Sequence, residues 1–180
     1  MEKESDITLV KRCSAGDKRA FEALVGKYEK AIFNIAFRVM NDYEDAMDIT
    51  QSVFIKTYER LQTFDQSRKF FSWLYRIAIN EALNYSKMKK FTEKIDSDFP
   101  ERRINPEERC AQSELSEHVQ QALKALKFDY RVVVVLKHFH DLSYKEISEI
   151  LDIPVKTVKS RLFTGRQLLK GMLIERGHAL

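Results

Sequence analysis

The chain has 180 residues, of which 44% are apolar and 32% charged, so it can form one good hydrophobic core or two small ones. Its formal net charge is only +4, so a strongly basic surface must be local. The two cysteines lie far apart and the four histidines show no ligand spacing with them, which favours a reduced cytosolic protein without a metal site. A charged start without an apolar signal core, and no stretch as long as a membrane span, predict a cytoplasmic location.

The first part of the chain predicts two helices with polar caps. Asp6 is suited to cap a short helix that ends near Gly16, and Asp17 a longer one that ends near Asn41. Apolar residues recur along the longer helix at steps of three and four, which predicts one buried face: Phe21, Leu24, Val25, Tyr28, Ile32, Ile35 and Val39.

A third helix is predicted over residues 43–61, with an acidic outer face. Its inward positions are Ala46, Ile49, Val53, Phe54 and Leu61. Among its outward residues, Glu44 and Asp45 sit in the first turn, where negative charge complements the helix dipole. Asp48 and Gln51 lie too far along the helix for that explanation, which leaves their outward placement unexplained.

A loop over residues 62–70 precedes a fourth helix, residues 70–90, with two different faces. One face is apolar and points to a core: Phe71, Leu74, Ile77, Ala78 and Ala82. The other places an aromatic ring, cations and amides in one row: Trp73, Arg76, Asn80, Asn84 and Lys87. Such groups bind unstacked bases and their phosphates, although Trp73 could instead be a core residue and Asn80 an incidental polar position.

The pattern of the chain lapses over residues 93–112, which are charged, contain two prolines and lack an apolar period. Helical spacing resumes over 113–126. Residues 130–140 are β-branched enough for a strand, but no second strand exists to pair with them, so a helix is predicted. The resulting architecture is all-α, with helical domains over 1–92 and 113–180 joined by a flexible linker over 93–112.

Residues 141–170 predict a helix-turn-helix, a DNA-binding motif also found in winged-helix proteins. Ser143 can cap the first helix, and Glu146 three positions later completes a capping box. Asp152 and Pro154 then break that helix, and Pro154 suits the first turn of the next one. The second helix places four apolar residues inward: Val155, Val158, Leu162 and Leu169. Its outward residues are basic or polar without an acid, as phosphate binding and base reading require. A solvated helical hairpin is the plainer alternative, but the cap, the turn and the charge agree with one another.

Three motifs in order resemble the sigma-70 family of bacterial initiation factors, in its extracytoplasmic-function group: DAMDITQSVFIKTYERL (45–61), FFSWLYRIAIN (70–80) and TVKSRLF (157–163). The resemblance implies two domains, called regions 2 and 4, and an RNA polymerase subunit without catalytic chemistry, cofactor or small-molecule substrate. It implies as partners the core polymerase, through the clamp helices of the β′ subunit and the β flap, promoter DNA, and an anti-sigma factor.

The resemblance also assigns roles by position. Residues of the polymerase-docking segment are Asp45, Asp48, Gln51 and Phe54. Residues expected at the minus-10 element are Phe64, Lys69, Trp73, Arg76, Asn80 and Asn84. Residues expected to read the minus-35 element are Lys156, Thr157, Lys159, Ser160, Arg161 and Phe163, of which Arg161 could equally be a phosphate anchor.

Two positions depart from the family pattern. Thr164 and Gly165 stand where a basic residue is common, and Gly165 inside a helix costs about 1 kcal/mol relative to alanine. Either the recognition helix bends or ends there, or close packing tolerates no side chain. Asp152 occupies a turn where the family often has glycine, so that turn is expected to be tighter or slightly strained.

Two other classes of function explain less of the sequence. A stand-alone regulator that binds operators as a dimer would explain residues 141–170 but leaves 45–54 and 73–84 without a task. An enzyme is disfavoured because no nucleophile-base pair, glycine-rich phosphate loop or metal cluster appears at usable spacing. The linker is expected either to mimic nucleic acid inside the polymerase or to act as a solvated tether.

Overall fold

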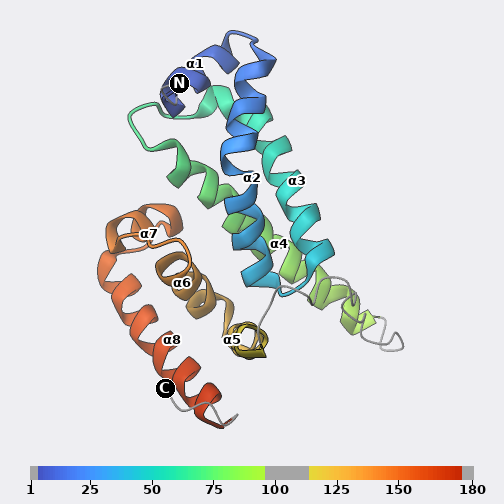
Figure 1. Ribbon diagram of the computed structural model, residues 1–180, viewed down its shortest axis with the longest axis vertical. Helices are drawn as coiled ribbons and strands as arrows, with labels where there is room; N and C mark the ends of the chain where they lie inside the picture. Colours follow the sequence, from blue (N-terminus) through green and yellow to red (C-terminus); the bar gives the residue numbers. More distant parts are fainter. Residues whose placement is uncertain (1–3, 96–113, 176–180) are drawn as a thin grey trace.

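The computed structural model describes residues 4–95 and 114–175 (Figure 1). This part of the chain is helical, and no β-strand occurs in it, so no wing of strands accompanies the helix-turn-helix there. The helices and one 3₁₀ turn, η1, follow in this order: α1 (Asp6–Ser14), α2 (Lys18–Met40), α3 (Tyr43–Arg60), η1 (Leu61–Thr63), α4 (Phe70–Ile95), α5 (Glu114–Ala125), α6 (Phe128–His138), α7 (Tyr144–Leu151) and α8 (Val155–Glu175). None of the described helices is long and apolar enough to cross a membrane.

The first unit consists of α1 to α4, with α2, α3 and α4 running side by side (Figure 1). The buried stripe predicted for α2 is confirmed at five of its seven positions, while Phe21 and Val25 are only half-buried. Asp17 caps α2, as predicted, and Asn41 ends it in the left-handed conformation at φ 56°.

The cap predicted for the first helix is wrong by one residue. Ser5 accepts a hydrogen bond from the Thr8 amide, 3.2 Å away, and is the N-cap of α1. Asp6 lies in the first turn instead and accepts hydrogen bonds from Lys27 and from the Tyr28 hydroxyl, at 2.5 and 2.7 Å. Its carboxylate therefore ties α1 to α2.

The second unit consists of α5 to α8 and contains the helix-turn-helix. The helix predicted over residues 130–140 is confirmed: α6 has five consecutive buried residues, Val132 to Leu136, because α2, α7 and α8 all pack against it. Burial on all sides explains why this helix reads as a continuous apolar run. The predicted capping box between Ser143 and Glu146 is present at the start of α7.

The second helix of the motif, α8, runs through Gly165 without ending, which decides between the alternatives for that glycine. A β-carbon at Gly165 would lie 2.9 Å from Cγ2 of Val134 on α6. Close packing therefore excludes a side chain there. Val155, predicted to point inward, is instead 37% exposed at the start of α8.

The two units are packed against each other, an arrangement that the sequence did not predict. Gln120 of α5 donates hydrogen bonds to the carbonyls of Phe37 and Arg38, at 3.1 and 3.2 Å, near the end of α2. Arg131 of α6 donates to the next carbonyl, that of Val39. The carbonyls of Arg38 and Val39 belong to the last turn, which a helix leaves without internal partners, and they are thus satisfied by the other unit. The carbonyl of Phe37 also accepts from the amide of Asn41.

The predicted linker over residues 93–112 is described only in part. Its first three residues form the last turn of α4, which extends to Ile95. Residues 96–112 lie outside the described residues.

Candidate nucleic-acid and protein interfaces

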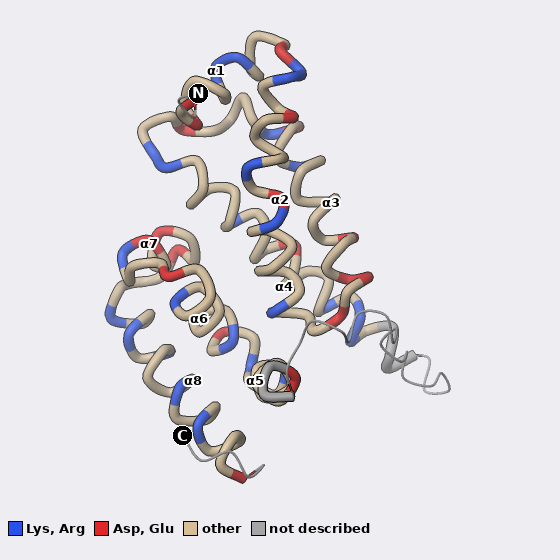
Figure 2. The backbone as a smooth tube through the Cα atoms, in the orientation of Figure 1, with Lys and Arg blue, Asp and Glu red and all other residues tan. Residues whose placement is uncertain are grey.

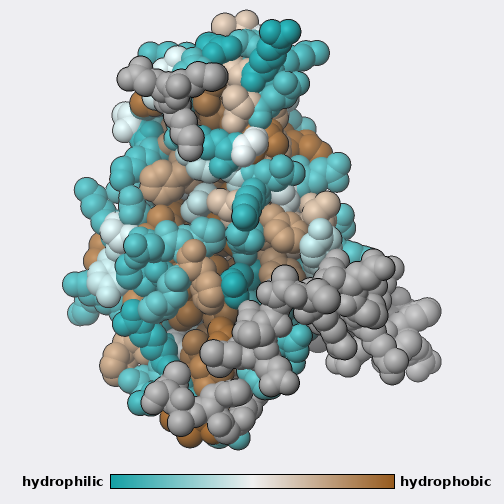
Figure 3. Space-filling view, viewed as in Figure 1, coloured by the Kyte–Doolittle hydropathy of each residue, from teal (hydrophilic) through white to brown (hydrophobic). Residues whose placement is uncertain are grey.

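A groove of about 700 Å³ lies between α2 and α3 and contains three of the four predicted docking residues, Asp48, Gln51 and Phe54. Its apolar wall also includes residues that the sequence analysis did not assign to a site: Phe21, Val25, Met47, Ile55 and Tyr58. An apolar area appears in Figure 3 where α2 and α3 lie side by side in Figure 1.

Large apolar side chains are unusually exposed along this groove. Met47, Ile55 and Tyr58 are 51%, 53% and 55% exposed. Contiguous apolar surface of this kind marks a binding site for another protein. The sequence contained a signal for this surface, because these large apolar residues fall outside the buried stripe of α3.

The fourth predicted docking residue, Asp45, is not part of this groove. It was expected on the outer face of the helix, but it is buried, and its carboxylate lies 2.7 Å from Nζ of Lys89 on α4. The outward placement predicted for Asp45 is therefore wrong. Its carboxylate joins α3 to α4 and is not available to a partner.

The residues predicted at the minus-10 element occupy two environments. Phe64 is buried, with its ring 5.5 Å from that of Phe70 and 5.2 Å from that of Trp73. Trp73 itself is half-buried, whereas Asn80 and Asn84 are exposed further along α4. The aromatic residues thus form one cluster at the start of α4, and the amides follow on its surface.

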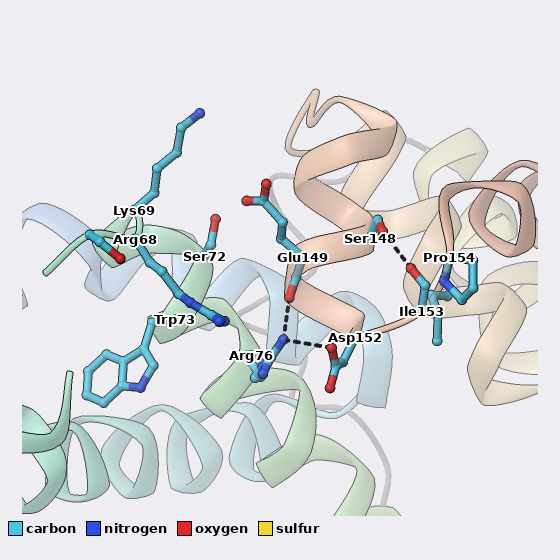
Figure 4. Close-up of a pocket in the computed structure, with 11 residues that line it drawn as sticks. Arg68, Lys69, Ser72, Trp73, Arg76, Ser148, Glu149, Asp152, Ile153 and Pro154 are labelled. Carbon is cyan, nitrogen blue, oxygen red and sulfur yellow. Dashed lines mark hydrogen bonds and ion pairs between the residues drawn. The ribbon is translucent and has the colours of Figure 1, made fainter. Parts of the chain in front are cut away.

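Lys69 and Arg76, the two cations of this set, are bound by α7 of the other unit. Nζ of Lys69 lies 2.8 Å from a carboxylate oxygen of Glu146. Arg76 donates to the carbonyls of Glu149 and Ile150, at 2.5 and 3.2 Å. Lys69, Arg76 and Glu149 border a cavity of about 680 Å³ between the units, which is shown in Figure 4.

The charges around this contact reinforce it. The hydrogen bond from Lys69, together with the capping hydrogen bonds from Ser143, lowers the pKa of Glu146 to about 2. The same hydrogen bond raises the pKa of Lys69. Both groups are therefore ionised at neutral pH.

Lysine and arginine residues recur along α8 (Figure 2). Of the predicted minus-35 residues, Lys156, Lys159 and Ser160 are exposed, and the ring of Phe163 is 66% exposed. Thr157 is half-buried. Arg161 lies 2.7 Å from the carboxylate of Asp129 on α6, so this arginine is held inside the unit by an ion pair.

The turn before α8 was expected to be slightly strained, because Asp152 stands where glycine was expected. Asp152 ends α7 in the left-handed conformation, at φ 55°. Aspartate visits this region more readily than most residues but less readily than glycine.

Family comparisons match both units in order. The family described as "Sigma-70 region 2" matches residues 24–92, and "Sigma-70, region 4" matches residues 116–169. The ECF RNA polymerase sigma factor SigW of Bacillus subtilis is 36% identical over 91% of this chain and 94% of its own length. The chain belongs to the sigma-70 family, in its extracytoplasmic-function (ECF) group.

Other relatives of this ECF sigma factor agree in sequence and in fold. The ECF sigma-E factor of Escherichia coli (strain K12) is 34% identical over 93% of this chain and 94% of its own. The structure of CnrH in complex with the cytosolic domain of CnrY has a TM-score of 0.76, with 26% identity over 96% of this chain and 99% of that one. RpoE from Bartonella quintana, in complex with the anti-sigma factor NepR, has a TM-score of 0.70, with 25% identity over 85% of this chain and 96% of that one.

These matches decide between the functions weighed from the sequence. The protein is a transcription initiation factor that directs RNA polymerase to promoters. A stand-alone helix-turn-helix regulator is excluded, because region 2 is present as well as region 4.

Proposed function

We propose that the surfaces of this ECF sigma factor divide the work of initiation, with the α2–α3 groove docking on the clamp helices of the polymerase β′ subunit. The single observation that carries this assignment is the groove itself. It is lined by apolar side chains together with three acidic residues, Glu29, Asp48 and Glu59. A groove with these properties fits an amphipathic helix whose polar face is basic.

The α4 surface is proposed to hold the non-template strand of the minus-10 element. Trp73 offers a ring for stacking, Lys69 and Arg76 offer cations for phosphates, and Asn80 and Asn84 offer amides for base edges. Phe64 packs beneath Trp73, so we assign it the role of positioning that ring. Asp45 is proposed to position α3 through Lys89 and not to touch the polymerase.

In region 4, α8 is proposed to enter the major groove of the minus-35 element. Lys156, Lys159 and Ser160 are exposed along it and supply the phosphate and base contacts, with Phe163 beside them. Thr157 lies on the same helix but is half-buried. Arg161 must release Asp129 before it can reach a base, so its contribution to affinity is expected to be smaller than that of Lys159.

The remaining assignments follow from the family. The protein acts in the cytoplasm, where polymerase is found, without a cofactor or catalytic step of its own, and region 4 also contacts the β flap. RpoE of Bartonella quintana was solved with the anti-sigma factor NepR. By analogy we infer that an anti-sigma factor also holds this chain inactive. Affinity purification of the chain from its native host should recover such a partner, and repeated purification without one would refute this inference.

The division of labour is tested by comparing variants of the two region 2 surfaces. Asp48→Ala and Phe54→Ala should weaken binding to core polymerase, measured by co-elution, because each removes a side chain of the groove. Trp73→Ala and Asn80→Ala should leave core binding intact but reduce permanganate reactivity of promoter thymines, which reports strand opening.

A control for charge and exposure is available in region 4. Glu117→Ala removes an exposed carboxylate from α5, outside both surfaces, and should change neither readout. Equal loss of core binding in the Asp48, Phe54, Trp73 and Asn80 variants would contradict the proposed division.

A further inference from the structure

The contact between α7 and α4 uses the end of one helix to bind the arginine of another. The guanidinium of Arg76 donates to the carbonyls of Glu149 and Ile150, which are among the last of α7. These carbonyls lack partners within the helix and carry the negative end of its dipole, so they stabilise a cation. The carboxylate of Asp152, the next residue after α7, lies 3.6 Å from the same guanidinium.

A second contact lies at the other end of α7. Glu146, in its first turn, pairs with Lys69 just before α4. Because α7 has only eight residues, its two ends together bind both cations, and the helix lies against the first turns of α4. Trp73 lies between these cations in the chain and borders the cavity that separates the units (Figure 4).

We propose that α7 of region 4 is an intramolecular latch that occupies the strand-binding cations of region 2. This proposal rests on the assignment of Lys69 and Arg76 to the minus-10 strand. In the latched state the α7 carbonyls and the carboxylates of Glu146 and Asp152 stand where phosphates of the strand would bind. Because α7 lies against the first turns of α4, a strand cannot take the same place, so latching and strand binding exclude each other.

The latch leaves the polymerase-docking groove open. That groove is formed by α2 and α3, and none of its lining residues comes from region 4. The free chain can therefore dock on polymerase while its α4 cations are bound, and separation of the two regions releases them for the promoter. The contacts of α7 with α4 are charged and carbonyl groups that water can also solvate, so these contacts break at modest cost. Full separation of the two regions also breaks the hydrogen bonds of Gln120 and Arg131 with the end of α2.

The latch explains why an aspartate, Asp152, occupies the left-handed position at the end of α7. Glycine would adopt the φ of 55° at this position without strain, but glycine has no carboxylate to present to Arg76. Asp152 is 85% exposed, so its ion pair alone is weak. A decisive variant must therefore neutralise Glu146 as well.

The variant E146Q/D152N does so with little change to the fold. Glutamine at the third helical position preserves a capping box, and asparagine tolerates the left-handed conformation. The matched control is D141N/E175Q, which changes the net charge equally and also replaces an aspartate at positive φ, 48° for Asp141. Asp141 pairs with Lys137 within region 4, and the side chain of Glu175 is exposed at the end of α8.

The protein contains its own reporter of opening. Trp73 is the one tryptophan of the chain, and it borders the cavity between the units. Acrylamide quenching of its fluorescence measures its accessibility in the full-length protein, without polymerase or DNA. Small-angle X-ray scattering of the same samples measures whether the radius of gyration increases.

We expect E146Q/D152N to show stronger quenching and a larger radius of gyration than both the wild type and D141N/E175Q. Its affinity for single-stranded DNA of mixed sequence should exceed that of the charge-matched control by about two- to thirtyfold, the range for losing two ion pairs at the surface.

Identical quenching and scattering for the two variants would overturn the latch. So would opening of the chain without a gain in DNA affinity over the control. Failure of the proposed polymerase docking would be seen separately, as loss of co-elution with core, and would leave these readings unchanged.

Discussion

Replacing Gly165 with alanine should destabilise region 4, against the usual effect of this change in a helix. In an open helical site, Gly→Ala stabilises by about 1 kcal/mol. At Gly165, however, the new methyl group would lie 2.9 Å from Cγ2 of Val134 and 3.5 Å from Cβ of Tyr130. Overpacking of this kind costs about 1 to 3 kcal/mol. The net change in the free energy of unfolding is therefore expected to be a loss of about 0 to 2 kcal/mol.

A second glycine of the same helix provides the control. Nothing lies within 4 Å of a β-carbon built at Gly171, so G171A should stabilise by up to about 1 kcal/mol. The difference between the two variants, measured by urea unfolding, isolates the packing cost. In a V134A background the contacting methyl group is absent, and G165A should then lose most of its penalty.

The result that would refute this reasoning is equal stabilisation by G165A and G171A. That result would mean that α6 shifts to accommodate the added methyl group without a measurable cost in stability. The glycine would then need an explanation other than packing.

The remaining predictions concern pH, salt and a buried charge. Burial, with a smaller effect from Arg38, lowers the pKa of His140 from 6.5 to about 4, so the unfolded chain takes up the proton first. The free energy of unfolding should thus fall as the pH drops below 6.5, by at most about 1.4 kcal/mol per pH unit, and H140Q should flatten that dependence in urea titrations. Lys159→Ala should reduce the slope of log affinity against log salt for promoter DNA by about 1, and an unchanged slope would remove Lys159 from the phosphate contacts. Lys89→Ala leaves the buried carboxylate of Asp45 without its partner and should cost about 1 to 3 kcal/mol in thermal or urea unfolding, whereas no loss would show that water replaces the lysine.

Local patterns predicted most of the helices because the decisive interactions are short in sequence. The capping box of Ser143 and Glu146 spans three residues, and the buried stripe of α2 repeats within each turn. The helix α6 required one further step, the absence of a partner strand, because an apolar β-branched run alone does not distinguish strand from helix.

Some errors were local, such as the N-cap of α1, which is Ser5 and not the adjacent Asp6. Others arose where a distant residue decides the environment. Asp45 and Asp48 lie on one helix, but only Asp45 meets Lys89, which is 44 residues away. Periodicity shows which positions share a face and cannot show which other helix that face meets. For the same reason the sequence left two explanations for Gly165, and only the position of Val134 decided between them.

The contact between regions 2 and 4 was the feature least accessible to sequence analysis. Arg76 was placed on an exposed row of α4 together with Trp73 and Asn80, but of these three only Asn80 is exposed, and Arg76 and Trp73 are half-buried. Its partners, however, are main-chain carbonyls 73 and 74 residues away, which carry no signature in the sequence. A cation on the surface of a helix indicates an anionic partner in general, and here both the promoter strand and α7 fit that description.

The measurement that tests the central claim most directly is run-off transcription with sigma-free bacterial core polymerase and fragmented genomic DNA from the host. The account predicts defined transcripts only when this protein is added, with start sites that reveal a minus-10 and a minus-35 element. No transcripts, together with failure to co-elute with core polymerase, would contradict it.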